Sequence, residues 1–349
     1  MKVLITGGCG FIGTHACLAY AKKGWDTVAY DNLTKYELAR TGYATDETRD
    51  FNQNLLRRSG VQVVEADVRH RPALLNAAAG CDYIIHTAAQ PAMTISREDP
   101  DLDFSTNVTG TYNVLTVARE LQVPVVFCSS IHVYGNRIND TLREGARRYE
   151  REPADIDESH PTVEGTMTPL HASKRSAELY VQTFIDSYQL KAATFRLTGM
   201  YGPYQFGGED HGWVANFAIR AALGRPLTVF GTGKQVRDIV YASDVVAAFE
   251  AFYERQVPGV YNIGGGQGTA TSLLEAIDTI GEVMGHRPEV NFGADRHGDL
   301  RYFVCNVDRA RRDLGWAPTV SPRQGIEKLV DWIAGNRPLF GSPVEPAKK

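Results

Sequence analysis

The sequence predicts an α/β fold, in which a doubly wound parallel sheet carries a smaller C-terminal domain built from several excursions of the chain. Three observations lead to it. In the first half, short apolar runs rich in Val, Ile and Leu alternate with longer segments of helical periodicity. A glycine-rich turn directly follows the first of these runs. After about Gly202, glycine and proline interrupt shorter elements, which indicates a change of architecture.

Taken in order, the first half contains five expected strands. The first is 2–6, where a run of Val, Leu and Ile ends at glycines, and the others are 27–30, 61–65, 83–86 and 124–128. Helices are expected at 15–23, 72–79 and 109–121. Strands that are apolar throughout need helices on both faces, and right-handed crossovers between parallel strands make the sheet doubly wound.

The second half adds the smaller domain, and 349 residues suffice for two domains. The segment 257–263 is typical of a strand that returns to the sheet, and 271–284 of a helix outside it. We therefore expect a sheet domain formed by 1–203, with returning segments at about 237–263 and 303–315. The smaller domain is expected at 204–236, 264–302 and 316–340. Substrate would bind between this domain and the carboxyl edge of the sheet.

Composition excludes several classes of function. Lys and Arg number 37 against 41 Asp and Glu, a balance too mildly acidic to attract a nucleic-acid backbone. No run approaches 18 apolar residues, and the N-terminus lacks the apolar core of a signal peptide. The five cysteines are odd in number and show no C-x-x-C spacing, so we expect small apolar residues in a reducing compartment. We therefore expect a cytoplasmic protein that has no metal site.

The glycine-rich turn has the spacing G-x-x-G-x-x-G at Gly7, Gly10 and Gly13. Gly7 permits the tight turn, Gly10 lets a pyrophosphate approach the backbone, and Gly13 allows close packing of helix on strand. The helix that opens here offers free N–H groups and partial positive charge to the pyrophosphate. Phe11 and Ile12 lie within the turn, and we include them among the candidate cofactor-binding residues. The pattern predicts a dinucleotide-binding domain of the Rossmann type.

An acidic residue, Asp31, follows the second strand about 18 residues beyond Gly13. Its carboxylate can accept hydrogen bonds from both adenosine ribose hydroxyls and repels a 2′-phosphate, which selects NAD over NADP. Asn32 follows it, and Asp67 with Val68 ends the third strand, where Asp67 is either an adenine contact or a helix N-cap. The alternative for the whole turn is a structural glycine turn in a domain without nucleotide.

Three further segments carry a family resemblance: His-Thr-Ala-Ala-Gln at 86–90, Cys-Ser-Ser-Ile-His-Val-Tyr-Gly at 128–135, and Ser173-Lys174. On these the chain resembles the extended short-chain dehydrogenase/reductase family, which acts largely on nucleotide sugars. Segments 90–96, 200–206, 212–214, 231–238 and 296–303 bring it nearest to the CDP-tyvelose (CDP-paratose) 2-epimerases. The resemblance runs from residue 1 to about residue 334.

The resemblance implies bound NAD, a nucleotide diphosphate held by arginines, and a sugar ring presented to the nicotinamide. It assigns Ser130 to the family's catalytic Ser/Thr and Lys174 to its catalytic lysine. Arg237 and Arg296 match diphosphate-binding arginines, whose forked donors suit phosphate oxygens, and the alternative for each is a surface ion pair. The further matching positions are Ala88, Ala89, Gln90 and Asn107 on the cofactor side, and Met93, Thr94, Tyr201 and Gln205 on the substrate side.

One departure from the family pattern concerns its signature Tyr-x-x-x-Lys. Four residues before Lys174 this sequence has Leu170. In the family the tyrosine is the general base, because nearby positive charge lowers the pKa of its phenol. Helical spacing places Leu170 and Lys174 on one face, so the tyrosine is missing from inside the expected site.

Three interpretations of this departure stay open. In the first, another residue takes the proton, such as the adjacent His171, which a turn of about 100° per residue aims away unless the helix starts there. A plain alternative for His171 is an exposed helix residue. In the second, Lys174 itself is the base. In the third, the protein binds the cofactor without turnover. We count Ser130, Lys174 and His171 as candidate catalytic residues, and loop candidates for the base are His132, Tyr134, Tyr201, Asp210 and His211.

The predicted function is NAD-dependent modification of a sugar by transient oxidation of a hydroxyl group, by a nucleotide-sugar epimerase of the 2-epimerase type. An alternative is a dehydratase of a nucleotide sugar or nucleoside-like metabolite, for example by 5,6-elimination. The family's 4,6-dehydratases carry an Asp-Glu pair where this chain has Ile131-His132. A different class is an NAD-bound binding protein without catalysis. Through the helix at 170–190 we expect a homodimer, the alternative being a helix that covers the sheet of a monomer.

Overall fold

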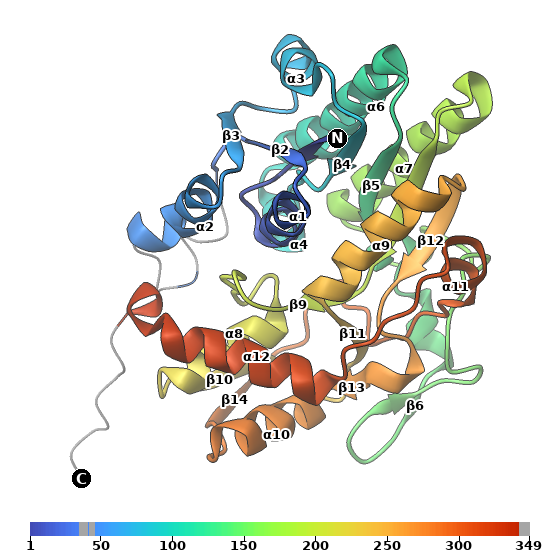
Figure 1. Cartoon of the computed structure of the whole chain (residues 1–349). Coiled ribbons are helices and arrows are strands. Elements are labelled where there is room, and N and C mark those ends of the chain that lie inside the picture. The colour runs from blue at the N-terminus through green and yellow to red at the C-terminus, as the bar shows by residue number, and fades with distance from the viewer. Residues whose placement is uncertain (35–40, 42–45, 342–349) are drawn as a thin grey trace.

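A seven-stranded parallel sheet forms the centre of the protein (Figure 1), seen in a computed structural model that describes residues 1–34, 41 and 46–341. Its strand order is β12-β8-β5-β4-β1-β2-β3, and every neighbouring pair is parallel. The order reverses at β1, so the predicted doubly wound sheet is confirmed. The strands are β1 (Lys2–Thr6), β2 (Asp26–Asp31), β3 (Gln62–Glu65), β4 (Tyr83–His86), β5 (Val125–Ser130), β8 (Ala192–Leu197) and β12 (Gly259–Ile263).

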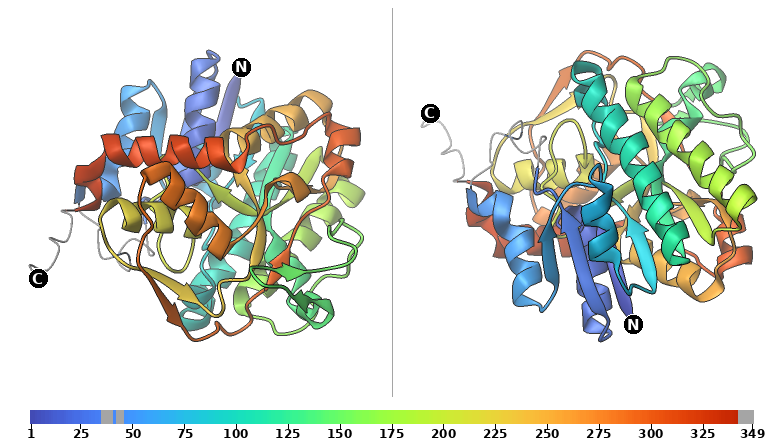
Figure 2. Two further views of the ribbon diagram at one scale, coloured as in Figure 1. Left: turned by 90° about the horizontal axis from the view of Figure 1, so that it is seen from below. Right: turned by 90° about the horizontal axis from the view of Figure 1, so that it is seen from above.

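Helices cover both faces of this sheet because its strands are apolar on both sides. Along β1, Val3 and Ile5 pack with α1 (Phe11–Lys22), α2 (Asp46–Arg58) and α9 (Ala242–Arg255). The intervening Leu4 packs with α3 (Arg71–Ala78), α6 (Gly110–Leu121) and α7 (Pro169–Tyr188). Figure 2 shows α6 and α7 side by side on their face. Between β4 and α6 the chain forms α4 (Met93–Glu98), α5 (Pro100–Phe104) and a π-helical segment, Ser105–Thr109.

The smaller domain lies at the carboxyl edge of the sheet. It contains a four-stranded sheet, a two-stranded parallel sheet and helices packed around them (Figure 1). The first sheet consists of β9 (Gly199–Tyr201), β11 (Val236–Tyr241), β13 (Ala270–Ser272) and β15 (Tyr302–Phe303), and the second of β10 (Leu227–Phe230) and β14 (Val290–Gly293). The helices are α8 (Trp213–Ala222), α10 (Leu273–Met284) and α12 (Pro322–Gly335), while α11 (Asp308–Leu314) packs on α9, and β6 (Arg143–Glu144) pairs with β7 (Tyr149–Glu150).

Several expectations can be compared with these elements. The strand expected at 257–263 is confirmed, because β12 joins the main sheet beside β8. The helix expected at 15–23 begins earlier, at Phe11, because Gly10 already serves as its N-cap. The segment from residue 237, expected to return to the sheet domain, forms β11, which pairs with β9, β13 and β15 instead. The boundaries of the two domains remain a prediction.

Two compositional expectations also have structural counterparts. All five cysteines are free and buried, as expected for small apolar residues. Within residues 1–34 and 46–341, every helix is too short or too polar to cross a bilayer.

Candidate active site

The glycine turn between β1 and α1 is built so that side chains would obstruct it. Gly7 has φ +66°, and a Cβ there would lie 2.6 Å from the backbone nitrogen of Ala88. A Cβ on Gly13 would lie 2.0 Å from the carbonyl oxygen of Gly7, so helix and strand could not pack. Gly10, the N-cap of α1, would meet only that same oxygen, at 3.1 Å. Phe11 and Ile12 form the first turn of α1. The backbone N–H groups at this helix terminus are therefore approachable by an anion.

Asp31 stands at the end of β2, beside this turn. Its Oδ2 accepts a hydrogen bond from the backbone N–H of Cys9 at 2.9 Å, and its Oδ1 accepts one from Leu33 at 2.8 Å. The two backbone hydrogen bonds fix the orientation of the carboxylate, a group that can accept hydrogen bonds from ribose hydroxyls. The glycine cradle and the oriented carboxylate fit an NAD molecule, with its pyrophosphate on α1 and its adenosine ribose on Asp31.

Asp67 and Asn32 lie next to Asp31 at the ends of β3 and β2. Asn32 donates from Nδ2 to Asp67 Oδ2 at 3.0 Å. Hydrogen bonds from the Arg69 side chain lower the pKa of Asp67 to about 2. The N-cap interpretation of Asp67 is wrong, because His70 occupies the N-cap of α3. Val68 packs against Gly110, where a Cβ would come within 2.7 Å of it.

The turn after β4, which contains Ala88 and Ala89, is tied to α7 through Asn107. The Gln90 backbone N–H donates to Asn107 Oδ1 at 3.0 Å, and Asn107 Nδ2 donates to the Gln90 carbonyl at 3.1 Å. The same Nδ2 lies 3.1 Å from the hydroxyl of Ser173 on α7. Asn107 belongs to the π-helical segment, a distortion that often marks functional sites.

Ser130 is the last residue of β5, and Lys174 on α7 reaches the same strand two residues earlier. The Oγ of Ser130 accepts a hydrogen bond from the backbone N–H of His132 at 3.2 Å. Nζ of Lys174 donates to the carbonyl of Cys128, on the same strand, at 3.0 Å. Burial lowers the pKa of Lys174 to about 8, although the negative charge of Asp103 opposes the shift. The structure therefore places the two residues that the family resemblance assigns to catalysis at the end of one strand, β5.

Leu170 and His171 lie in the first turn of α7, which begins at Pro169. Leu170 is buried one helical turn before Lys174. The alternative that His171 is an exposed helix residue is wrong, because only 1% of it is accessible. Its Nδ1 accepts a hydrogen bond from the backbone N–H of Thr168 at 3.0 Å, which closes a capping box. Pro at the first helical position after Thr168 was the sequence signal for this helix start.

The structure does not bring the two tyrosine candidates to this site. The hydroxyl of Tyr134 donates to Asn262 Oδ1 at 2.8 Å, and that of Tyr201 donates to the Pro322 carbonyl at 3.3 Å. Burial raises the pKa of both phenols. Tyr201 was also a predicted substrate contact, but it packs against α12 in the core of the smaller domain.

Among the other candidates for the base, His132 is close to the site. Its ring lies edge to face with that of His171, at a centroid distance of 5.5 Å. Burial lowers its pKa to about 3, which makes His132 a weak base at neutral pH. Asp210 and His211 lie on the loop between β9 and α8.

The two predicted phosphate-binding arginines come from different parts of the smaller domain. The side chain of Arg237, on β11, is 12% exposed, and its Nη2 lies 3.7 Å from Asp299 Oδ1. It is not the surface ion pair of the alternative interpretation. The guanidinium of Arg296 lies 4.1 Å over the ring of Phe230 and donates to the carbonyl of Glu209.

The remaining predicted substrate contacts lie on loops and helix starts. Met93 and Thr94 begin α4, which packs on α7, and Thr94 Oγ1 is buried with no partner in the part of the chain described. Gln205 donates from Nε2 to the Met200 carbonyl at 3.3 Å. Its Oε1 is buried and likewise meets no donor from the described residues.

A buried ionic network behind Ser130 was not predicted. Glu178, one turn after Lys174 on α7, accepts from Arg196 on β8 at 3.0 Å and 2.8 Å. It also accepts from the hydroxyl of Ser129 at 2.7 Å. The network therefore fastens α7 to the carboxyl ends of β5 and β8. The spacing Lys-x-x-x-Glu was the available sequence signal, since it places both residues on one helix face.

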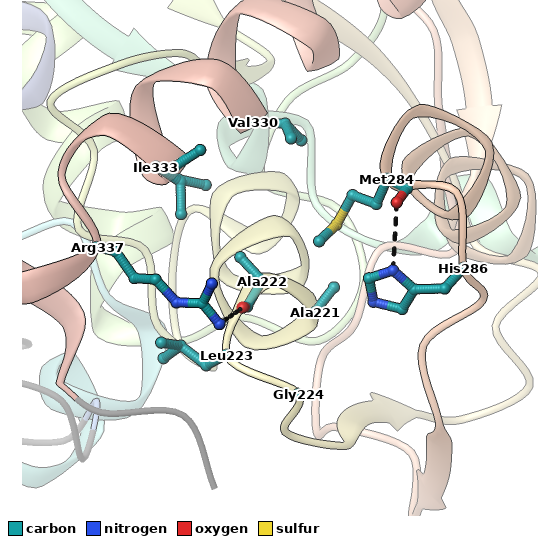
Figure 3. Close-up of a pocket in the computed structure, with 10 residues that line it drawn as sticks. Ala221, Ala222, Leu223, Gly224, Met284, His286, Val330, Ile333 and Arg337 are labelled. Carbon is teal, nitrogen blue, oxygen red and sulfur yellow. Dashed lines mark hydrogen bonds between the residues drawn. The ribbon is translucent and has the colours of Figure 1, made fainter. Parts of the chain in front are cut away.

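A cavity of about 350 Å³ lies away from these residues, between α8, α10 and the C-terminal helix α12 (Figure 3). Apolar side chains such as Met284 and Ile333 line it, with His286 and Arg337 at its edge. None of the predicted site residues borders it.

Comparisons with known proteins agree with this geometry. Residues 3–264 match the model of the "NAD dependent epimerase/dehydratase family". CDP-paratose 2-epimerase from Salmonella typhi is 31% identical, covering 96% of this chain and 99% of that protein. UDP-glucose 4-epimerase from Thermus thermophilus, solved in complex with NAD, is 31% identical with a TM-score of 0.77, covering 96% of this chain and 99% of that one. UDP-glucose 4-epimerase from Thermotoga maritima, solved with UDP-glucose, is 27% identical with a TM-score of 0.80, covering 97% and 100%. The chain belongs to the NAD dependent epimerase/dehydratase family and is an NAD-dependent enzyme of the extended short-chain dehydrogenase/reductase type.

Proposed function

We propose that this protein is a nucleotide-sugar epimerase of the 2-epimerase type, which works by transient oxidation of a sugar hydroxyl. The observation that carries the proposal is that Lys174 reaches β5, the strand that ends in Ser130, at the carboxyl edge of the sheet where the glycine turn also lies. The 2-epimerase type is supported by the similarity to CDP-paratose 2-epimerase along almost the entire length of that protein.

In the proposed mechanism, Ser130 and Lys174 have different roles toward the sugar hydroxyl group. When bound, NAD would supply a hydride acceptor that also gives the hydride back, so that no net oxidation occurs. Because Ser130 Oγ accepts from the His132 backbone, its own O–H is available to donate to the sugar oxygen. With a pKa of about 8, part of Lys174 is an unprotonated amine at neutral pH, and this amine accepts the hydroxyl proton as the C–H bond breaks. When the hydride returns, the proton returns from Lys174 to the oxygen.

The arginines of the smaller domain would hold the diphosphate. Arg237 is a nearly buried cation whose partner Asp299 is 3.7 Å away, so an anionic phosphate adds the compensation that this distance leaves incomplete. Arg296 comes from a separate segment of the smaller domain and keeps donors beyond the one used on Glu209.

A product analysis tests the proposal. The purified protein is assayed for bound NAD, then incubated in D₂O with CDP-paratose, CDP-tyvelose or UDP-glucose, and the products are analysed by NMR and mass spectrometry. We expect inversion at C2 of a CDP-sugar with no deuterium at the oxidised carbon. Loss of water, with deuterium beside the oxidised carbon, would identify a dehydratase instead. NAD bound without turnover of any nucleotide sugar would identify a binding protein.

We also propose that two copies of the chain pair through α6 and α7. Four large side chains on these neighbouring helices are between 41% and 53% exposed: Tyr112 on α6, and Leu179, Tyr180 and Tyr188 on α7. Tyr112 packs against Tyr180 at a centroid distance of 5.5 Å, so these two side chains join the exposed apolar surfaces of α6 and α7.

A further inference from the structure

His171 is held in one tautomer by the first turn of α7. A backbone N–H can only donate, so the N–H of Thr168, 3.0 Å from His171 Nδ1, requires a lone pair on that nitrogen, to which the Thr168 hydroxyl at 2.8 Å can also donate. In the neutral imidazole the proton is therefore on Nε2. His171 can give a hydrogen bond from Nε2 but cannot take a proton there.

The surroundings of His171 keep the ring neutral. A second proton on Nδ1 would break the hydrogen bond from the Thr168 N–H and leave the Thr168 hydroxyl, 2.8 Å away, as its acceptor, and the positive end of the α7 dipole disfavours a cation in the first turn. Burial acts in the same direction and lowers the pKa of His171. The titratable groups around it are His132, from the 3₁₀ turn Ile131–Tyr134, and Lys174 on α7 itself, with Arg237 beyond His132. Of the described carboxylates, none pairs with the ring.

The Nε2 atom is the part of His171 that remains open. Nε2 makes no hydrogen bond to any described residue, and it is not fully buried. Since only 1% of the residue is accessible, this small area includes Nε2. His171 lies three residues before Lys174, a spacing that makes them neighbours on the helix surface. Its ring touches His132, whose backbone binds Ser130.

We propose that His171 donates a hydrogen bond from Nε2 to the sugar oxygen that gives its proton to Lys174. This proposal rests on the proposed function, and it divides between two residues of α7 the work that one tyrosine does in the family. His171 keeps its own proton throughout: the proton of the O–H bond moves to the Lys174 amine and back. A neutral imidazole donor at a helix N-terminus is suited to this role, because it stabilises the developing charge on oxygen without competing as a base.

An NMR measurement tests the tautomer independently of activity. In protein with ¹⁵N-labelled histidine, assigned by comparison with His171→Gln, we expect neutral His171 to be in the Nε2–H form at pH 8. An Nδ1–H tautomer would overturn the proposal while leaving the proposed function intact.

Two variants separate the donor from the helix cap. Gln and Glu can both accept from the Thr168 N–H, as in an ordinary capping box, but only Gln retains a donor. We expect His171→Gln to keep kcat within about tenfold of wild type and His171→Glu to lose about 100-fold, with KM changed less than about threefold in both. Equal melting temperatures and NAD contents would show that both variants fold. If Glu is as active as Gln, His171 is only a cap and the proposal fails. A wild-type protein that converts no nucleotide sugar overturns the proposed function, and the donor role with it.

Discussion

Replacing Glu178 by Gln should lower the free energy of unfolding of the protein. The substitution preserves the shape of the side chain but leaves Arg196, whose side chain is only 4% exposed, as a buried cation without its counter-ion. Breaking a buried pair in this way costs about 3–5 kcal/mol of unfolding free energy. For 349 residues at about 2.1 cal/mol/K each, the unfolding entropy is about 0.7 kcal/mol/K, so the melting temperature should fall by about 4–7 °C.

The assay is thermal unfolding by calorimetry at pH 7, with Arg175→Gln as the matched control. Arg175 contacts the same carboxylate at 3.0 Å, but its side chain is 29% exposed, and its loss should cost less than about 1 kcal/mol. Since Glu178 also holds Ser129, the Glu178→Gln variant should lose activity as well. A fall in melting temperature no larger than that of the control would refute the argument that this network stabilises the join between α7 and the sheet.

Further predictions follow from the site and the surface. If the Lys174 amine is the base, kcat/KM rises about tenfold per pH unit up to about pH 8 and then levels; a flat profile between pH 6 and 8 would exclude this. Asp31→Asn should raise the Kd of NAD about 10- to 100-fold, measured by calorimetry, and reduce the preference of the protein for NAD over NADP. Leu179→Lys should convert a dimer to a monomer in light scattering, whereas an unchanged mass would place the interface elsewhere. Leu170→Tyr should fill a buried position without increasing kcat; a gain above about tenfold would identify an ordinary site with a damaged base.

The main sheet was predictable because its strands are short, apolar and separated by helical periodicity. Tyr83–His86 and Lys2–Thr6 were expected with the observed limits. β8 was not expected, because Arg196 interrupts its apolar run and is buried only through Glu178, a partner remote in sequence. The short strands of the smaller domain, such as β11, depend on pairing partners from distant segments, and local patterns do not contain that information.

In the site, the sequence indicated which residues to expect, but not which way each would point. The glycine turn and Asp31 follow from the ends of neighbouring strands at one edge of the sheet, whereas Ser130 and Lys174 were assigned through the family resemblance. The orientation of His171 depends on the residue at which α7 begins, and Tyr201 on packing against α12. Such details are fixed by tertiary contacts and not by periodicity.

The leucine at position 170 also changes the electrostatics of its neighbour. A phenolate beside Lys174 would stabilise the ammonium form and hold the pKa of the lysine high. The buried Leu170 provides no such charge, and burial lowers the pKa of Lys174. In the proposed mechanism, the absence of the tyrosine therefore removes one base and, for the same physical reason, makes Lys174 available as another. The proposal then assigns the donor for the sugar oxygen to the Nε2–H tautomer of His171.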